Sequence, residues 1–309
     1  MKLKHVISAK QFSKENVKEI LETAQQIKSG KYNSKSLSGK IMATLFYEPS
    51  TRTRMSFESS MLRLGGLVIT TEDAKLFSSA SKGETLEDTI RIVHSYADVI
   101  VLRHFDAGAS EIASNYSRVP VINAGDGNGE HPTQALLDLF TIFSKFKSKN
   151  LTISMIGDLT NGRTIHSLSQ LLSLFPQIKL IFVSPKALAI PKELKAHLRT
   201  KRINFTETED LNKSIRISDV IYQTRIQKER FNSKKEYLKY FGKYIIDKNT
   251  LKILKDNAII MHPLPRVNEI TKEVDSDSRA IYFEEAQNGL FVRMALLTLL
   301  FDKSHNKPR

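Results

Sequence analysis

The sequence predicts an α/β protein of two domains, each built on a mostly parallel sheet flanked by helices. Short apolar runs alternate with longer segments whose apolar residues recur every three or four positions. This alternation is typical of β-α-β units and therefore of parallel sheets. At 309 residues the chain is long for a single core. The polar segment 147–150 is the clearest break between the two halves.

The predicted strands are apolar runs bounded by polar or turn-forming residues. In chain order they cover residues 41–46, 67–70, 99–102, 119–123, 151–156, 179–183, 203–206, 219–222 and 258–261. The predicted helices have apolar positions on one face and residues suited to capping at their ends. They cover residues 13–30, 50–65, 86–97, 107–116, 131–146, 163–175, 191–198 and 284–301.

Residues 50–54 read Ser-Thr-Arg-Thr-Arg and stand between the first of these strands and its helix. Pro49 interrupts the strand, Ser50 or Thr51 can cap the helix, and Gly65 can end it. Three hydroxyls and two guanidinium groups therefore meet the unpaired N–H groups and positive dipole of a helix N-terminus. This combination predicts an anion site, most naturally for a phosphate. The alternative is an ordinary capped helix with solvated arginines, which would better explain a single arginine.

Other polar residues also stand at the ends of predicted strands. They are Arg103, His131, Arg163, Arg225 and His262. Ligands of open α/β sheets bind along this edge, whereas a solvated surface would not concentrate arginines there. A lone histidine is more often part of the core, but His131 follows a glycine-rich loop and opens a helix. We therefore expect it to face a ligand.

Two of these segments have a chemistry of their own. Residues 157–164 resemble a nucleotide-binding P-loop, but Arg163 stands where the lysine belongs, and an arginine fork suits a carboxylate instead. Residues 262–266 read His-Pro-Leu-Pro-Arg. Two prolines remove backbone donors, so the carbonyl groups can accept hydrogen bonds from an ammonium or amide nitrogen. A rigid turn without a ligand is the simpler interpretation of the same residues.

Composition narrows the classes of function. The formal net charge is +14, but the lysines are scattered and lack interleaved aromatic residues, so a solvated surface explains them better than nucleic-acid binding. The positive field still favours small anionic substrates. The absence of cysteine excludes disulfides, thiolate zinc sites and a cysteine nucleophile. The histidines lack metal-binding spacing, and we expect neither a metal nor another cofactor.

Nothing in the sequence points to a membrane. No stretch approaches 18 uncharged apolar residues, and the N-terminus lacks the apolar core of a signal peptide. We expect a cytoplasmic protein with no membrane partner.

The motifs occur in the order found in the aspartate and ornithine carbamoyltransferases, and the chain resembles that family over nearly its whole length. The matching segments are residues 50–54, Ser81-Lys-Gly-Glu84, Arg103-His104, Asn123-Ala-Gly-Asp126, His131-Pro-Thr-Gln134, Gly162-Arg-Thr164, Thr224-Arg-Ile-Gln-Lys-Glu-Arg230 and 262–266. Ornithine-specific members carry a cysteine in the last segment, where this chain has His-Pro-Leu-Pro. Arg225 with Gln227 also suits an acidic amino acid better than ornithine.

The resemblance implies a fold and a reaction. Residues 1–132, with a C-terminal helix of about 285–309 packing back on them, would bind carbamoyl phosphate, and residues 133–284 would bind L-aspartate. In the cleft between them the aspartate amino group would attack the carbamoyl carbon and phosphate would leave, the committed step of de novo pyrimidine synthesis. No nucleophilic side chain is needed, so catalysis would rest on orientation and on stabilisation of developing charge.

The resemblance also implies a role for individual residues. The phosphate ligands would be Ser50, Thr51, Arg52 and Thr53. The catalytic residues, which contact the carbonyl oxygen of the substrate, would be Thr53, Arg103 and His131. The ligands of the carbamoyl nitrogen would be Gln134 and the backbone of Pro263 and Leu264. The aspartate ligands would be Arg163, Arg225, Gln227 and Leu264. A neighbouring subunit of a homotrimer with shared active sites would contribute Ser78 and Lys82.

Some residues depart from the family pattern, and other functions stay open. The departures near the site are Glu130, Thr160, Asn161 and Asn268. The alternative within enzymes is a carbamoyltransferase for another amine such as ornithine. Outside enzymes, it is a basic nucleic-acid-binding α/β protein. The sequence does not decide whether regulatory chains attach.

Overall fold

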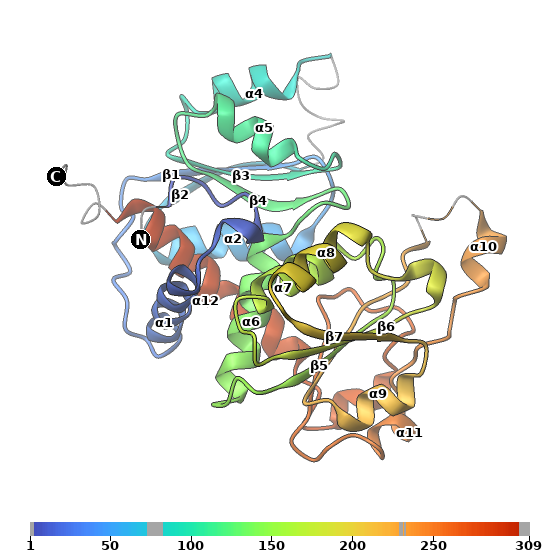
Figure 1. Ribbon diagram of the computed structural model, residues 1–309. Coiled ribbons are helices and arrows are strands. Elements are labelled where there is room, and N and C mark those ends of the chain that lie inside the picture. Colours follow the sequence, from blue (N-terminus) through green and yellow to red (C-terminus); the bar gives the residue numbers. More distant parts are fainter. Residues whose placement is uncertain (1–2, 73–82, 229–230, 232, 303–309) are drawn as a thin grey trace. The chain divides into compact units, whose positions relative to one another are not determined.

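The computed structural model describes residues 3–72, 83–228, 231 and 233–302 (Figure 1). The chain forms two compact units. The first unit consists of Met1–Phe140 and Gln287–Arg309, and the second unit consists of Thr141–Ala286. Among the described residues, no helix is both long enough and apolar enough to cross a membrane.

The first unit contains a four-stranded sheet in which every pair of neighbours is parallel. Its order is β2-β1-β3-β4. The strands are β1 (Ile41–Phe46), β2 (Leu67–Glu72), β3 (Val99–His104) and β4 (Val121–Asp126). Among the described residues, the helices that lie wholly within this unit are α1 (Lys14–Lys28), α2 (Thr51–Arg63), α4 (Leu86–Val93) and α5 (Ala109–Tyr116), with a 3₁₀ turn at Ala9–Gln11. Helices α4 and α5 lie on one face of the sheet, and α1 and α2 lie on the other (Figure 1).

The second unit contains a five-stranded parallel sheet of order β7-β6-β5-β8-β9. The strands are β5 (Thr152–Ile156), β6 (Lys179–Val183), β7 (Asn204–Thr208), β8 (Val220–Gln223) and β9 (Ile259–Met261). The helices are α7 (Arg163–Leu172), α8 (Lys192–Thr200), α9 (Leu211–Ile217), α10 (Lys234–Leu238) and α11 (Lys248–Leu251). Two 3₁₀ turns cover Lys186–Leu188 and Lys272–Ser276.

Two helices pass from one unit to the other: α6 (Pro132–Lys145) and α12 (Tyr282–Phe301). The end of α12 packs on the first unit, as the family resemblance implied. Arg293 Nη1 donates to Ser56 Oγ on α2 over 2.9 Å, and its guanidinium lies 5.0 Å from the centre of the Phe57 ring. Ser60 Oγ donates to the Leu290 carbonyl over 3.2 Å. These contacts join α12 to the helix that follows β1.

All nine predicted strands are present, and the predicted parallel sheets are confirmed. The largest error in a helix end is at the predicted segment 86–97, because α4 ends at Val93 and residues 94–96 form a turn. Helices α9, α10 and α11 were not predicted from the sequence. These helices have seven residues or fewer, too few to establish a helical period.

Gly65 ends α2 and requires glycine for two reasons. Its φ is +81°, and a Cβ there would lie 2.7 Å from the Ser34 carbonyl oxygen. Gly30 follows α1 with the same φ of +81°, but a Cβ there would meet nothing within 4 Å. A substitution at Gly30 would therefore cause backbone strain alone, whereas one at Gly65 would cause backbone strain and a steric clash.

We expect Gly65→Ala to destabilise the protein more than Gly30→Ala. Both changes force an L residue into the left-handed region at about 1–2 kcal/mol. Only Gly65→Ala adds a clash with backbone, worth about 1–3 kcal/mol more. Urea unfolding of the two variants and the parent measures the difference. Equal losses would show that the segment around Ser34 moves aside without cost.

Candidate active site

The predicted site residues follow three adjacent strands in each sheet. In the first unit, residues 50–54 follow β1, Arg103 lies near the end of β3, and His131 comes five residues after β4. The chain passes from β1 to β2 on one side and returns to β3 on the other. In open parallel sheets, such a reversal leaves a crevice at the carboxyl ends of the strands, where ligands bind.

The second unit repeats this arrangement around β5 and β8. Arg163, Arg225 and His262 come after β5, β8 and β9, which are neighbours in the sheet. The chain reverses its direction across the sheet between β7 and β8, so that β5 and β8 flank the switch point. In each unit, the predicted ligand-binding residues thus lie at the edge of the sheet where a parallel sheet can bind a small molecule.

Helix α2 begins at Thr51, and Ser50 is its N-cap residue. The Ser50 side chain makes no capping hydrogen bond, so its hydroxyl is available to a ligand. Thr53 is buried, Thr51 and Arg52 are exposed, and partial desolvation lowers the pKa of the Arg52 guanidinium. Arg54 differs, because its Nε lies 3.9 Å from Glu58 Oε1. The start of α2 therefore offers hydroxyls, N–H groups and the Arg52 cation to an anion.

Arg103 is held by groups on both sides of β3. Its Nη1 donates to the Ala124 carbonyl over 3.2 Å, and its Nη2 lies 3.2 Å from Glu48 Oε2. Only 11% of its side chain is exposed. Glu48 follows β1 and Ala124 belongs to β4, so these contacts fix the guanidinium among the strand ends.

His131 and Gln134 belong to the start of α6, and both side chains are buried. The His131 carbonyl accepts from the N–H groups of Gln134 and Ala135 over 3.0 and 3.1 Å. Glu130, one of the departures from the family pattern, accepts from Ser8 Oγ and the Ala9 N–H, each over 2.6 Å. Burial raises the pKa of Glu130, and these two bonds oppose the rise. Glu130 thereby ties the loop before His131 to the N-terminal segment.

In the second unit, the buried Asp158 organises the loop between β5 and α7. Its carboxylate accepts from the N–H and the side-chain amide of Asn161, over 3.0 to 3.2 Å. Gln227 Nε2 donates to the Asn161 carbonyl over 3.1 Å. Burial raises the pKa of Asp158, while hydrogen bonds from the backbone of Asn161 and Gln227 oppose the rise. Asn161, another departure, thus joins the loop before Arg163 to the loop containing Gln227.

The segment after β9 is fixed by the buried side chain of His262. The Leu264 N–H donates to His262 Nδ1 over 2.7 Å, and His262 Nε2 lies 2.8 Å from Glu269 Oε1. Leu264 has φ +50°, and the Leu264–Pro265 peptide bond is cis. Because Nδ1 accepts a hydrogen bond, the ring proton is on Nε2 and the imidazole is neutral. The histidine therefore fixes the backbone of Pro263 and Leu264.

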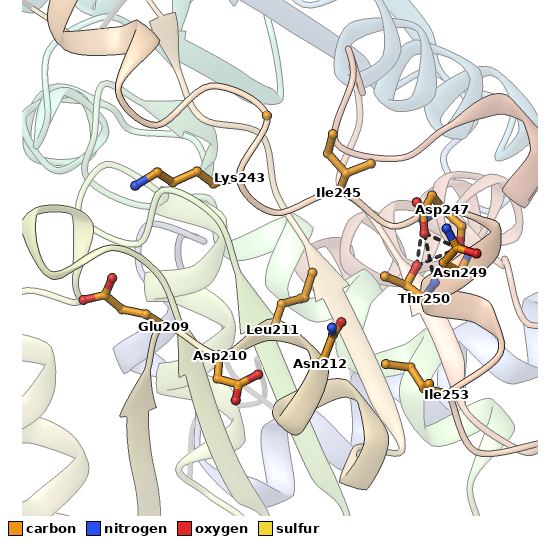
Figure 2. Close-up of a pocket in the computed structure, with 11 residues that line it drawn as sticks. Glu209, Asp210, Leu211, Asn212, Lys243, Ile245, Asp247, Asn249, Thr250 and Ile253 are labelled. Atoms are coloured by element: carbon orange, nitrogen blue, oxygen red, sulfur yellow. Dashed lines mark hydrogen bonds between the residues drawn. The ribbon is translucent and has the colours of Figure 1, made fainter.

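A separate cavity of about 480 Å³ lies in the second unit, and none of the predicted site residues lines it (Figure 2). Asp247 and Asp210 contribute carboxylates to its lining, but both cap helices. Asp247 Oδ1 accepts from the N–H groups of Asn249 and Thr250, each over 2.9 Å. Asp210 Oδ1 accepts from the Lys213 N–H over 2.9 Å. Ser78 and Lys82, predicted to act in a neighbouring subunit, lie outside the described residues.

The comparisons with known proteins agree with the division of the site. Residues 4–144 match the model of the aspartate/ornithine carbamoyltransferase carbamoyl-P binding domain, and residues 149–300 match the model of the Asp/Orn binding domain. The chain belongs to the aspartate/ornithine carbamoyltransferase family.

Two relatives of similar sequence are named aspartate carbamoyltransferase. The chloroplastic aspartate carbamoyltransferase of Arabidopsis thaliana is 52% identical over 303 residues, covering 96% of this chain and 78% of the relative. The aspartate carbamoyltransferase catalytic subunit of Methanocaldococcus jannaschii is 50% identical, covering 99% of this chain and all of the relative.

Solved structures agree as well. The M. jannaschii catalytic subunit has a TM-score of 0.89 at 49% identity, covering 99% of this chain and 100% of its own. Aspartate transcarbamoylase from Trypanosoma cruzi, in complex with carbamoyl phosphate and aspartate, has a TM-score of 0.89 at 42% identity, covering 96% of each chain. The fold of the family is therefore the fold of this chain.

Sequence reasoning missed the buried acids that position the site. Three of them are Asp138, Asp158 and Glu269, with exposed fractions of 0%, 0% and 6%. Each receives hydrogen bonds from a site loop or a predicted site residue. A carboxylate is usually at the surface, so an isolated Asp or Glu in a sequence gives no signal that it is buried.

We expect His262 to be neutral at pH 7, with a pKa below 6.5, because burial opposes its charge. The contribution of neutral His262 to folding stability is then fully present above pH 6.5. It is lost as the pH falls below that value, because His262 binds a proton in the unfolded chain at a higher pH than in the folded chain. NMR titration of the ring resonances gives the pKa. In Glu269→Gln the pKa should fall further, because the carboxylate that favours the imidazolium is gone. A pKa above 6.5 would contradict the neutral tautomer.

Proposed function

We propose that the chain transfers the carbamoyl group of carbamoyl phosphate to L-aspartate, which gives N-carbamoyl-L-aspartate and phosphate. One observation carries the proposal: each unit presents its cationic side chains at the switch point of its own parallel sheet. The unit with the anion-binding turn matches the carbamoyl-P binding model, and the unit with Arg163 and Arg225 matches the Asp/Orn binding model. The product would be the first committed intermediate of pyrimidine synthesis.

The phosphate group would bind at the start of α2. Ser50, Thr51 and Thr53 supply hydroxyls, and Arg52 supplies the cation that makes these hydrogen bonds charge-assisted. Arg54 is assigned no contact with substrate, because it pairs with Glu58. The helix dipole adds to the attraction, and the +14 net charge favours the approach of both anionic substrates.

The carbamoyl group would lie beside Arg103, His131 and Gln134. The aspartate nitrogen attacks the carbamoyl carbon, and the carbonyl oxygen becomes an oxyanion as the C–N bond forms. Thr53, Arg103 and His131 stabilise that charge as donors. The C–O bond to phosphate then breaks, its electron pair leaves with the phosphate, and the departing phosphate accepts the one proton that the amine loses. The carbamoyl nitrogen donates to Gln134 and to the carbonyls of Pro263 and Leu264.

Aspartate would be held by Arg163, Arg225 and Gln227, with the Leu264 backbone. An arginine can bind a carboxylate through two parallel hydrogen bonds. Two arginines suit the two carboxylates of aspartate, whereas the side-chain ammonium of ornithine would be repelled. Ornithine is therefore the weaker candidate for the amine.

The proposal includes a homotrimer in which Ser78 and Lys82 act in the site of the neighbouring subunit. It rests on the match of residues 81–84 to the family pattern. Native mass spectrometry tests the trimer, and addition of candidate regulatory chains tests whether they attach.

The cytoplasmic location also stays a prediction, since the Arabidopsis relative is named chloroplastic. A fluorescent fusion in the source cells would test it.

Arg225→Ala should raise the KM for aspartate at least about tenfold, because a charge-assisted hydrogen bond is worth about 1.5–3 kcal/mol. The KM for carbamoyl phosphate should change little. Steady-state carbamoylation of L-aspartate, with L-ornithine as the competing amine, gives both values and the substrate preference. If the wild type prefers ornithine, the proposed amine is wrong. If both KM values rise equally, Arg225 does not bind aspartate alone.

Arg103→Ala should lower kcat about 10²-fold or more, the usual effect of losing one oxyanion donor. His131→Ala should have a milder effect, since it removes a group with less positive charge. The measurement is kcat at saturating concentrations of both substrates. A rise in KM at unchanged kcat would place Arg103 in ground-state binding and remove it from oxyanion stabilisation.

A further inference from the structure

Gln134 and Asp138 lie one turn apart on α6, and both side chains are buried. Gln134 Nε2 donates to Asp138 Oδ1 over 2.8 Å. Asp138 has an exposed fraction of 0% and Gln134 one of 9%. Gln134, the residue predicted to bind the carbamoyl nitrogen, is therefore hydrogen-bonded to a carboxylate that is fully shielded from solvent.

This contact decides which way the Gln134 amide is turned. An ionised carboxylate only accepts hydrogen bonds, so the group facing it must be the NH₂ end of the amide. The two ends of an amide lie on opposite sides of its carbon, and Oε1 consequently points away from Asp138. A glutamine without this partner could present either end to a ligand, because the two orientations have nearly the same shape.

We propose that Asp138 is a positioning residue for carbamoyl recognition: it holds Gln134 with Oε1 turned toward the amino group of the substrate. The inference rests on the proposed function and deepens it. The carbamoyl nitrogen carries two N–H donors and needs acceptors. An amide held in the opposite orientation would place its own NH₂ against that nitrogen and donor would face donor.

The buried charge of Asp138 is balanced by Arg293 of α12. Arg293 is 3% exposed, and burial lowers its pKa to about 10, with Asp138 opposing the decrease. The guanidinium is therefore still charged at neutral pH. Gly289, one turn earlier, leaves room for it, since a Cβ there would lie 2.4 Å from Arg293 Nη1. A buried carboxylate is stable only with such compensation.

The arrangement predicts discrimination against ligands that lack the amino group. Acetyl phosphate has the shape of carbamoyl phosphate with a methyl group in place of NH₂. Its binding would leave the Gln134 oxygen facing a methyl group, and an acceptor that loses its partner costs free energy. The ratio of the two dissociation constants, acetyl phosphate over carbamoyl phosphate, therefore reports the orientation of the amide.

The test compares this ratio in the wild type, Asp138→Asn, Gln134→Ala and the double variant, by competition binding. Asparagine keeps the shape of aspartate but can donate as well as accept, so the Gln134 amide is no longer held one way. We expect the ratio to fall about fivefold in Asp138→Asn. It should fall as far in Gln134→Ala and no further in the double variant. The dissociation constant of inorganic phosphate, which has no carbamoyl group, should stay the same.

An unchanged ratio in Asp138→Asn, with a reduced ratio in Gln134→Ala, would overturn the positioning role. So would an equal loss of affinity for inorganic phosphate, which would indicate general damage. If Asp138→Asn does not fold, the paired change Asp138→Asn with Arg293→Gln removes both buried charges and is judged by the same ratio. Wild-type carbamoylation of aspartate is assayed separately, so that failure of the proposed function is distinguished from failure of this inference.

Discussion

The parallel alignment of every strand pair in both sheets is the constraint on which the site depends. Parallel pairing sends the carboxyl ends of all strands in a sheet to one edge, and each connection returns the chain to the opposite edge. In the first unit, three segments far apart in sequence reach that edge: residues 50–54, Arg103 and His131. In the second unit, Arg163, Arg225 and His262 do the same. Parallel pairing thus brings the proposed ligand-binding residues of each unit to one edge of its own sheet.

Buried acids then fix the groups that the sheets bring together. Asp158 fixes the loop before Arg163, Glu269 orients His262, and Asp138 orients Gln134. Each carboxylate accepts a hydrogen bond from a residue that belongs to a site loop or is itself a predicted site residue. A reaction without a nucleophilic side chain depends on groups that are oriented before the substrate arrives, because reorientation would consume the binding energy. The buried charges are thus part of the proposed mechanism.

The repeated strands and helices could be predicted from the sequence because their apolar runs and periods are local. The helix α2 is an example, since Pro49, Ser50 and Gly65 mark both of its ends. Helices such as α11, with four residues, are set by tertiary packing and capping, and no period reveals them. Of the site, the residues within motifs could be predicted from the family resemblance.

Residues outside motifs could not be predicted in this way. Arg293 lies on the last helix, 237 residues from its partner Ser56. Nothing in the sequence indicates that Asp138 is buried. Glu130 departs from the family pattern, and only the structure shows that it binds Ser8 and Ala9. In each case the information is a contact between segments that only the folded chain brings together.

In the proposed reaction, phosphate binds at the carboxyl end of β1, at the start of α2. Calorimetric titration of inorganic phosphate into the wild type, Arg52→Ala and Arg118→Ala tests it most directly. Arg118 is an exposed arginine of the same unit, but it precedes β4 and so stands at the opposite edge of the sheet. Arg52→Ala should weaken phosphate binding at least about tenfold, and Arg118→Ala should leave it unchanged. Equal losses in the two variants, or none in Arg52→Ala, would contradict it.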